Sequence, residues 1–170
     1  MLLGLNCKKS EELASVENIQ TVFLNKNIKE TLLYKKKYVV KEDVVDDDES
    51  GTNWKIISLI LNGEKKITLE TSWKKKDIIK RIYIFDSSVT INNMKVIGVP
   101  IKSILKIVKS ASYDESFGTF YLSSKTNPNI NFELDTKKIK QNSSILLKWE
   151  KNIDMIPKFV TVSAIIINSK

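Results

Sequence analysis

The strongest constraint on the fold is a pair of β-prone runs joined by the dipeptide Asn62-Gly63. Trp54 to Leu61 is an apolar, β-branched run, and Lys65 to Thr71 is a second such run directly after the dipeptide. Asn-Gly between two runs of this kind is the strongest short-range hairpin signal, because both central residues of the favoured turn need positive φ. The chain is therefore expected to contain antiparallel strands.

Short segments of the same character occupy much of the remaining chain. Residues Ile78 to Phe85 alternate with period two, which predicts a strand with Ile78, Lys80, Ile82 and Ile84 on one face and Ile79, Arg81, Tyr83 and Phe85 on the other. Further strands are expected at 19–24, within 28–45, and at 89–91, 94–97, 118–123, 129–134 and 159–167. Residues 145–149 are compatible with either a strand or a helix.

One segment carries a helical pattern. Pro100 suits a first helical position, where its missing N–H removes no hydrogen bond. After it, Ile101, Ile104, Leu105 and Val108 recur at i, i+3, i+4 and i+7, which predicts a helix over 100–109 with one apolar face. Strands with few helices predict an α+β fold: a mostly antiparallel β-sheet with one or two helices packed on one face. A length of 170 residues suits a single domain, which we place at 18–170 after an N-terminal tether at 1–17.

The residues that most often carry catalysis are scarce. The chain has no histidine and a single cysteine, which excludes Ser-His and Cys-His nucleophilic catalysis and the usual zinc ligand sets. Its few glycines form no phosphate-binding loop. We therefore predict no catalytic residue, no metal site and no cofactor, and we expect that the protein is not an enzyme. An enzyme that uses carboxylates alone is the remaining catalytic alternative.

The net charge of +8 raises the question of nucleic-acid binding. Arg81 is the only arginine, whereas base and phosphate recognition favour the bidentate arginine side chain. The lysines are also spread along the whole chain. Nucleic acid is therefore an unlikely partner, although a cytoplasmic nucleic-acid-binding module with a lysine-rich surface is kept as the alternative function.

Two clusters are candidates for a binding surface. The densest basic cluster with an aromatic residue is Trp73, Lys74, Lys75 and Lys76, near Lys80 and Arg81, and it suits an acidic protein partner or anionic lipid headgroups. Tyr113 and Phe117 contribute aromatic area of the kind enriched at interfaces. Solvated charge in the first cluster, and core packing in the second, explain the same residues.

The N-terminal residues bear on where in the cell the protein is located. Leu2, Leu3 and Leu5 precede Cys7, and Lys8-Lys9-Ser10-Glu11-Glu12 follows it. This arrangement resembles the end of a bacterial lipoprotein signal, with the lysine-then-acidic stretch of Bacteroidetes-type surface lipoproteins. The resemblance implies lipidation at Cys7, membrane contact through the lipidated N-terminus, and a location in the cell envelope. An ordinary N-terminus with an inert cysteine, in a cytoplasmic protein, is the alternative.

A second resemblance concerns the domain itself. A strand, the Gly98-Val99-Pro100 turn, a predicted helix and a hairpin ending in Phe132-Glu-Leu-Asp135 resemble small secreted bacterial domains, some of which are inhibitors or immunity proteins. The resemblance implies a protein partner, such as a toxin or hydrolase, and a basic surface suits an acidic one. We therefore expect a non-catalytic protein-binding domain.

Overall fold

The computed structural model describes residues 13–47, 50–137, 139 and 143–169. The chain divides into two compact units, Met1–Lys95 with Ile167–Lys170, and Val96–Ile166. Over the described residues the fold is mostly antiparallel β-sheet with two α-helices, so the α+β class is confirmed at this level. No helix in these residues is long and apolar enough to cross a membrane. The single domain, and the packing of both helices on one face, stay predictions.

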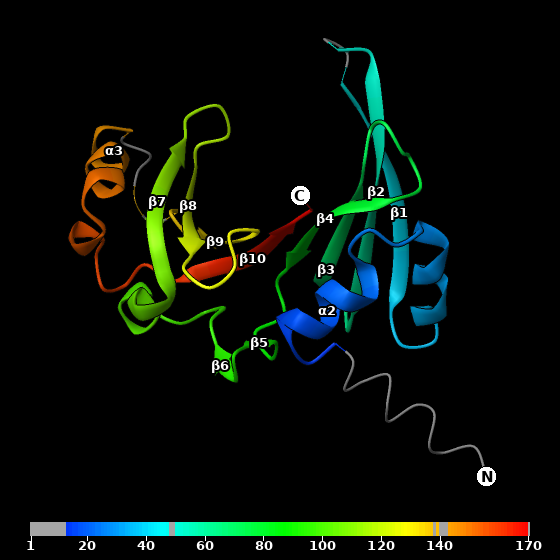
Figure 1. The fold of residues 1–170 in the computed structure, drawn as a ribbon, viewed down its shortest axis with the longest axis horizontal. Helices are drawn as coiled ribbons and strands as arrows, with labels where there is room; N and C mark the ends of the chain where they lie inside the picture. Colours follow the sequence, from blue (N-terminus) through cyan, green and yellow to red (C-terminus); the bar gives the residue numbers. More distant parts are fainter. Residues whose placement is uncertain (1–12, 48–49, 138, 140–142, 170) are drawn as a thin grey trace. The chain divides into compact units, whose positions relative to one another are not determined.

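The first unit is built on four antiparallel strands in the order β1-β2-β3-β4 (Figure 1). They are β1 (Val39–Asp47), β2 (Thr52–Leu61), β3 (Glu64–Thr71) and β4 (Ile79–Ile84). Asn62 and Gly63 join β2 to β3 with φ values of 53° and 77°, which confirms the predicted hairpin. A smaller hairpin of β5 (Thr90–Ile91) and β6 (Met94–Lys95) follows, as expected.

The predicted strand at 19–24 is wrong, because this segment lies in helix α2 (Val16–Phe23). Ser15 caps the helix, and its side chain accepts the Asn18 N–H at 3.2 Å. Val16, Ile19 and Phe23 recur at i, i+3 and i+7 and are buried. This spacing gives a helix one apolar face, and the segment is helical despite its β-branched residues. Leu13 is buried as well. The packed part of the chain therefore begins before the predicted end of the tether at residue 17.

The strands expected within 28–45 are confirmed only in the second half of the segment. Residues Ile28–Tyr34 form the 3-10 helix η1, and β1 begins at Val39. The Thr31 hydroxyl donates to the Ile28 carbonyl at 2.7 Å, a local hydrogen bond that competes with strand pairing. The Tyr34 ring packs on Phe23 at 5.1 Å between centroids, which ties η1 to α2.

Strand β4 is confirmed, but its predicted faces are wrong at the start of the strand. Glu70 of β3 pairs with Arg81, whereas Thr71 pairs with Ile79, so Lys80 is an extra residue without a partner in the register. This β-bulge shifts the alternation by one residue. Ile79, Ile82 and Ile84 consequently share the buried face, and Ile78 does not belong to it.

The second unit carries strands in the order β10-β9-β8-β7. They are β7 (Val108–Asp114), β8 (Thr119–Ser124), β9 (Ile130–Leu134) and β10 (Val162–Asn168), of which the last two residues of β10 belong to the first unit. The ambiguous segment 145–149 lies in helix α3 (Ser143–Lys151), where Trp149 makes an edge contact with Phe120. The last strand begins later than expected, at Val162.

The predicted helix over 100–109 is wrong. Two single 3-10 turns, η2 (Ile101–Ser103) and η3 (Leu105–Ile107), occupy the segment, and β7 starts at Val108. Ile101 and Ile104 are buried, and a spacing of three places side chains on one side of a 3-10 helix as well. The Ile101 N–H donates to the Val160 carbonyl at 3.0 Å. This bond holds the segment beside residue 160.

Candidate functional site

The basic cluster predicted at Trp73 lies on the connection between β3 and β4, residues 72–78, which we name the Trp73 loop. The Ser72 hydroxyl accepts the backbone N–H groups of Lys74 at 3.1 Å and Lys75 at 3.2 Å. The backbone N–H of Ser72 donates to the Ile78 carbonyl at 2.9 Å, and the Ile78 N–H donates to the Lys75 carbonyl at 2.8 Å. The five residues between Ser72 and Ile78 are therefore held in a closed turn.

The Trp73 loop presents an aromatic ring and uncompensated positive charge. Trp73 is 54% exposed, and the Lys74 Nζ lies 4.8 Å from the centroid of its ring, a cation–π contact. Lys74, Lys75 and Lys76 are exposed and form no salt bridge with any carboxylate in the described residues. The acidic residue of the loop, Asp77, pairs with Lys55 at 3.3 Å. The three lysines therefore remain available to an outside partner.

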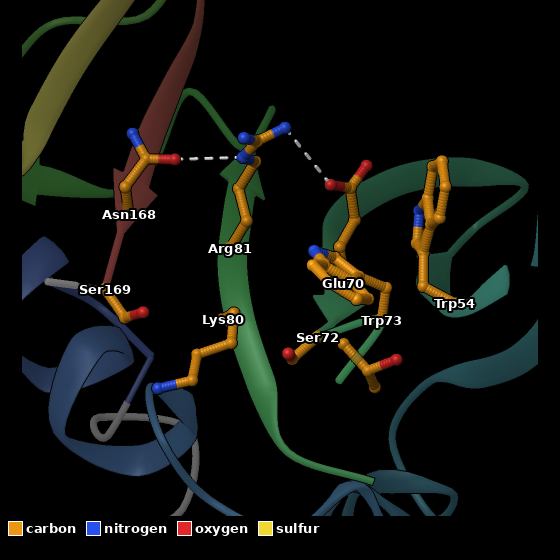
Figure 2. Close-up of a pocket in the computed structure, with 9 residues that line it drawn as sticks. Trp54, Glu70, Ser72, Trp73, Lys80, Arg81, Asn168 and Ser169 are labelled. Carbon is orange, nitrogen blue, oxygen red and sulfur yellow. Dashed lines mark hydrogen bonds and ion pairs between the residues drawn. The ribbon is translucent and has the colours of Figure 1, made fainter. Parts of the chain in front are cut away.

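A pocket of about 570 Å³ opens beside the loop, within the first unit. Figure 2 shows Trp54, Glu70 and Arg81 projecting to the same side of the neighbouring strands β2, β3 and β4. The lining consists of two tryptophans, one ion pair and small polar side chains: Trp54, Glu70, Thr71, Ser72, Trp73, Lys80, Arg81, Asn168 and Ser169. The volume lies within the range of about 300–1,000 Å³ that small-molecule sites occupy.

Arg81 is fixed by its neighbours in the pocket. Its Nε donates to Asn168 Oδ1 at 2.9 Å, and its Nη1 donates to the Tyr83 hydroxyl at 3.3 Å. The same Nη1 lies 3.5 Å from Glu70 Oε2. These contacts orient the guanidinium and place a carboxylate against it, so the charge of Arg81 is already compensated.

Glu70 is more confined than Arg81, since its side chain is 19% exposed and that of Arg81 is 51% exposed. Burial raises the pKa of its carboxyl above the ordinary value, and the Arg81 charge and the Tyr83 hydroxyl oppose this rise. The Arg81 guanidinium and the Tyr83 hydroxyl therefore stabilise the charged form of Glu70. Thr68, two residues earlier on β3, is also buried, and its hydroxyl has no hydrogen-bond partner among the described residues.

The structure brings only part of the predicted cluster together. Trp73, Lys80 and Arg81 all line the pocket, but the Lys80 ammonium donates to Asn25 Oδ1 at 2.7 Å. In Figure 2 the Lys80 side chain points away from that of Arg81. The extra residue in the β-bulge at this point of β4 breaks the expected alternation of faces. Lys80 is therefore not part of a common basic surface with Arg81.

Tyr113 and Phe117 lie in the second unit and do not line the pocket. The backbone N–H of Tyr113 donates to Glu150 Oε1 at 3.3 Å, which ties β7 to α3. Phe117 is 80% exposed on the turn between β7 and β8. Cys7 lies outside the described residues. Within them, no group of three or more cysteine or acidic side chains is placed to hold a metal ion.

Six of the lining residues were not predicted as site residues, among them Trp54, Glu70 and Asn168. Trp54 and Glu70 lie on strands that were predicted, and the hairpin register through Ile56 places both on one face. A β-bulge between Leu59 and Ile60 shifts this register by one residue, so the turn alone would have placed Trp54 and Glu70 on opposite faces. Asn168 is far from the others in sequence, and nothing in the sequence pattern connects it with Arg81.

No family model matches the chain, and no curated protein matches it. Among solved structures, the chain is similar to the crystal structure of the uncharacterised protein yfeY from Escherichia coli, with a TM-score of 0.57 and 13% sequence identity. The similarity covers 84% of this chain and 90% of that one. At this level of identity the likeness shows a shared fold and nothing about function.

Proposed function

We propose that the protein is a non-catalytic protein-binding domain whose Trp73 loop docks against an acidic partner. The observation that carries the proposal is the exposed Trp73 ring beside three lysines that have no described carboxylate partner. Tryptophan is among the residues that most often dominate the binding energy of an interface. Uncompensated charge around such a ring speeds the encounter with an acidic surface.

The cellular context of the proposal is the cell envelope, facing the periplasm or the outside. A lipid anchor on Cys7 would hold the domain at a membrane surface, and a short exposed loop on a compact domain suits binding to a neighbouring protein. The concrete version is an immunity or inhibitor protein that covers the active site of an antibacterial toxin or hydrolase. A basic loop is poorly matched to a nuclease toxin, because nucleic-acid-binding surfaces are themselves basic.

The test compares two charge reversals of equal size. One variant carries Lys74→Glu, Lys75→Glu and Lys76→Glu, and the matched control carries the same changes at the exposed run Lys35, Lys36 and Lys37. Both variants have the same net charge, so a general loss of attraction affects them equally. Each chain is immobilised and incubated with the solubilised envelope and, separately, with the cytosol of the source cells, and the retained proteins are quantified.

The proposal predicts one stoichiometric acidic protein from the envelope fraction, retained by the native chain and the control and lost from the variant at the Trp73 loop. Absence of a stoichiometric partner, or equal loss in both variants, contradicts it. The nucleic-acid alternative is tested with a labelled DNA duplex at low ionic strength. Binding that weakens steeply with added salt would favour that alternative.

A further inference from the structure

We propose that the pocket between the Trp73 loop and β4 binds a neutral sugar ring. This inference goes beyond the docking of a protein partner, because it concerns the floor of the pocket and not the lysines of the loop. It rests on two tryptophans, on a fixed array of polar groups, and on the ion pair of Arg81 with Glu70.

The first part of the argument is the pair of indole rings. Trp54 and Trp73 both line the pocket, and Trp73 is exposed beyond it. An indole face carries negative electrostatic potential and attracts polarised C–H groups. A pyranose ring presents such C–H groups on its faces and hydroxyl groups around its rim. Aromatic walls with polar groups between them therefore match both parts of a sugar.

The second part is the polar array on the floor. Asn168 Oδ1 accepts the Nε–H of Arg81, and this bond fixes the orientation of the Asn168 amide. The NH₂ group of the same amide is its hydrogen-bond donor. Glu70 supplies carboxylate acceptors, and Arg81 holds it in place. The carboxylate can accept hydrogen bonds from the hydroxyl groups of a sugar, and the amide NH₂ can donate to them. These groups are set before any ligand binds, which lowers the entropy cost of binding.

The third part is charge, which decides between a neutral and an anionic ligand. The only guanidinium of the chain lies 3.5 Å from the Glu70 carboxylate, and the Lys80 ammonium is directed to Asn25. Asn25 is a neutral partner and leaves the Lys80 charge uncompensated, but in Figure 2 the Lys80 side chain points away from that of Arg81. An anion beside Arg81 would therefore meet the Glu70 carboxylate. A purely apolar ligand would remove the ion pair from water without replacing its hydrogen bonds. A neutral polyhydroxylated ring avoids both costs.

The experiment measures the binding of three oligosaccharides to the full chain: maltotetraose, cellotetraose and chitotetraose. Saturation-transfer NMR reports contact with the sugar protons, and tryptophan fluorescence reports affinity. Binding of at least one sugar is expected, with an affinity about tenfold lower in Glu70→Gln and in Trp54→Leu, since one well-placed contact accounts for a factor of this size. Phe117→Leu, at an exposed site in the second unit, is the matched control and should bind as the native chain does.

Thermal unfolding of each variant first establishes that it folds. The inference is overturned if no sugar of the three binds, or if Glu70→Gln binds the sugar as tightly as the native chain. Binding of a hexaglutamate peptide in the pocket, lost in Arg81→Met, would overturn it as well. The double reversal Lys75→Glu and Lys76→Glu, which keeps the Lys74 contact with the Trp73 ring, should leave sugar binding unchanged, so failure here is distinguishable from failure of the proposed protein docking.

Discussion

Two buried threonines on β3 allow a matched test of what hydrogen bonding contributes to the sheet that carries the pocket. Thr68 and Thr71 are 6% and 5% exposed. The Thr71 hydroxyl accepts the backbone N–H of Lys55 at 2.9 Å, whereas the Thr68 hydroxyl has no partner among the described residues. Valine has nearly the same shape as threonine, so Thr68→Val and Thr71→Val change polarity at two similar sites without opening a cavity.

The two substitutions should act in opposite directions. Burial of a hydroxyl without a partner costs about 1–3 kcal/mol, so Thr68→Val should stabilise the fold by about 1 kcal/mol. Thr71→Val leaves the Lys55 N–H without its acceptor and should destabilise by about 1–3 kcal/mol. For a chain of this length, 1 kcal/mol corresponds to a change in Tm of about 2–4 °C.

The assay is thermal unfolding followed by circular dichroism, with urea unfolding followed by tryptophan fluorescence as an independent probe. Thr68→Val should melt above the native chain and Thr71→Val below it. A Thr68→Val variant that melts lower than the native chain would refute the reasoning, since the hydroxyl would then contribute favourably to the fold. Equal Tm values for the two variants would refute it as well.

Three further predictions concern single positions in the first unit. Ser15→Ala removes the cap of α2 and should lower the stability by about 1 kcal/mol in urea unfolding. Gly63→Ala places a Cβ at φ 77° and should destabilise by about 1 kcal/mol, measured in the same way, although no atom lies within 4 Å of that Cβ. Glu70→Gln should raise Tm at pH 7, because burial raises the pKa of Glu70, so that the charged carboxylate costs more free energy in the folded chain than in the unfolded one, and glutamine removes this cost. Because the native Glu70 takes up its proton as the pH falls through that raised pKa, the difference in Tm should shrink towards acidic pH, and a difference that grows there would contradict the reasoning.

The strands were predictable where local chemistry and tertiary packing agree. Asn62-Gly63 determines a turn through backbone conformation alone, and the runs on either side are too β-branched to favour a helix. The segment after Pro100 was not predictable in the same way. Ile101 and Ile104 satisfy both an α-helical and a 3-10 spacing, and the pairing of Val108 with Ser124 of β8 takes up the residue that would complete the apolar face of an α-helix. That contact is distant in sequence.

The candidate site was predictable only in part. Trp73 and its lysines stand together in the sequence, so their shared loop followed directly from their order. The pocket beside them combines residues of β2, β3, β4 and the end of β10. Arg81 was recognised for its charge, but its partners Glu70 and Asn168 depend on strand order. The direction of Lys80 depends on a bulge of one residue, and no periodicity in the sequence reveals such an insertion.

The most direct test of the central claim is photocrosslinking from the Trp73 loop in intact source cells. Benzoylphenylalanine is placed at position 73 and, as a control, at position 117, which is also exposed and aromatic. The account predicts one crosslinked acidic envelope protein from position 73, absent from position 117 and absent when Lys74, Lys75 and Lys76 are changed to glutamate. Crosslinks of equal yield from both positions, or none from position 73, would contradict it.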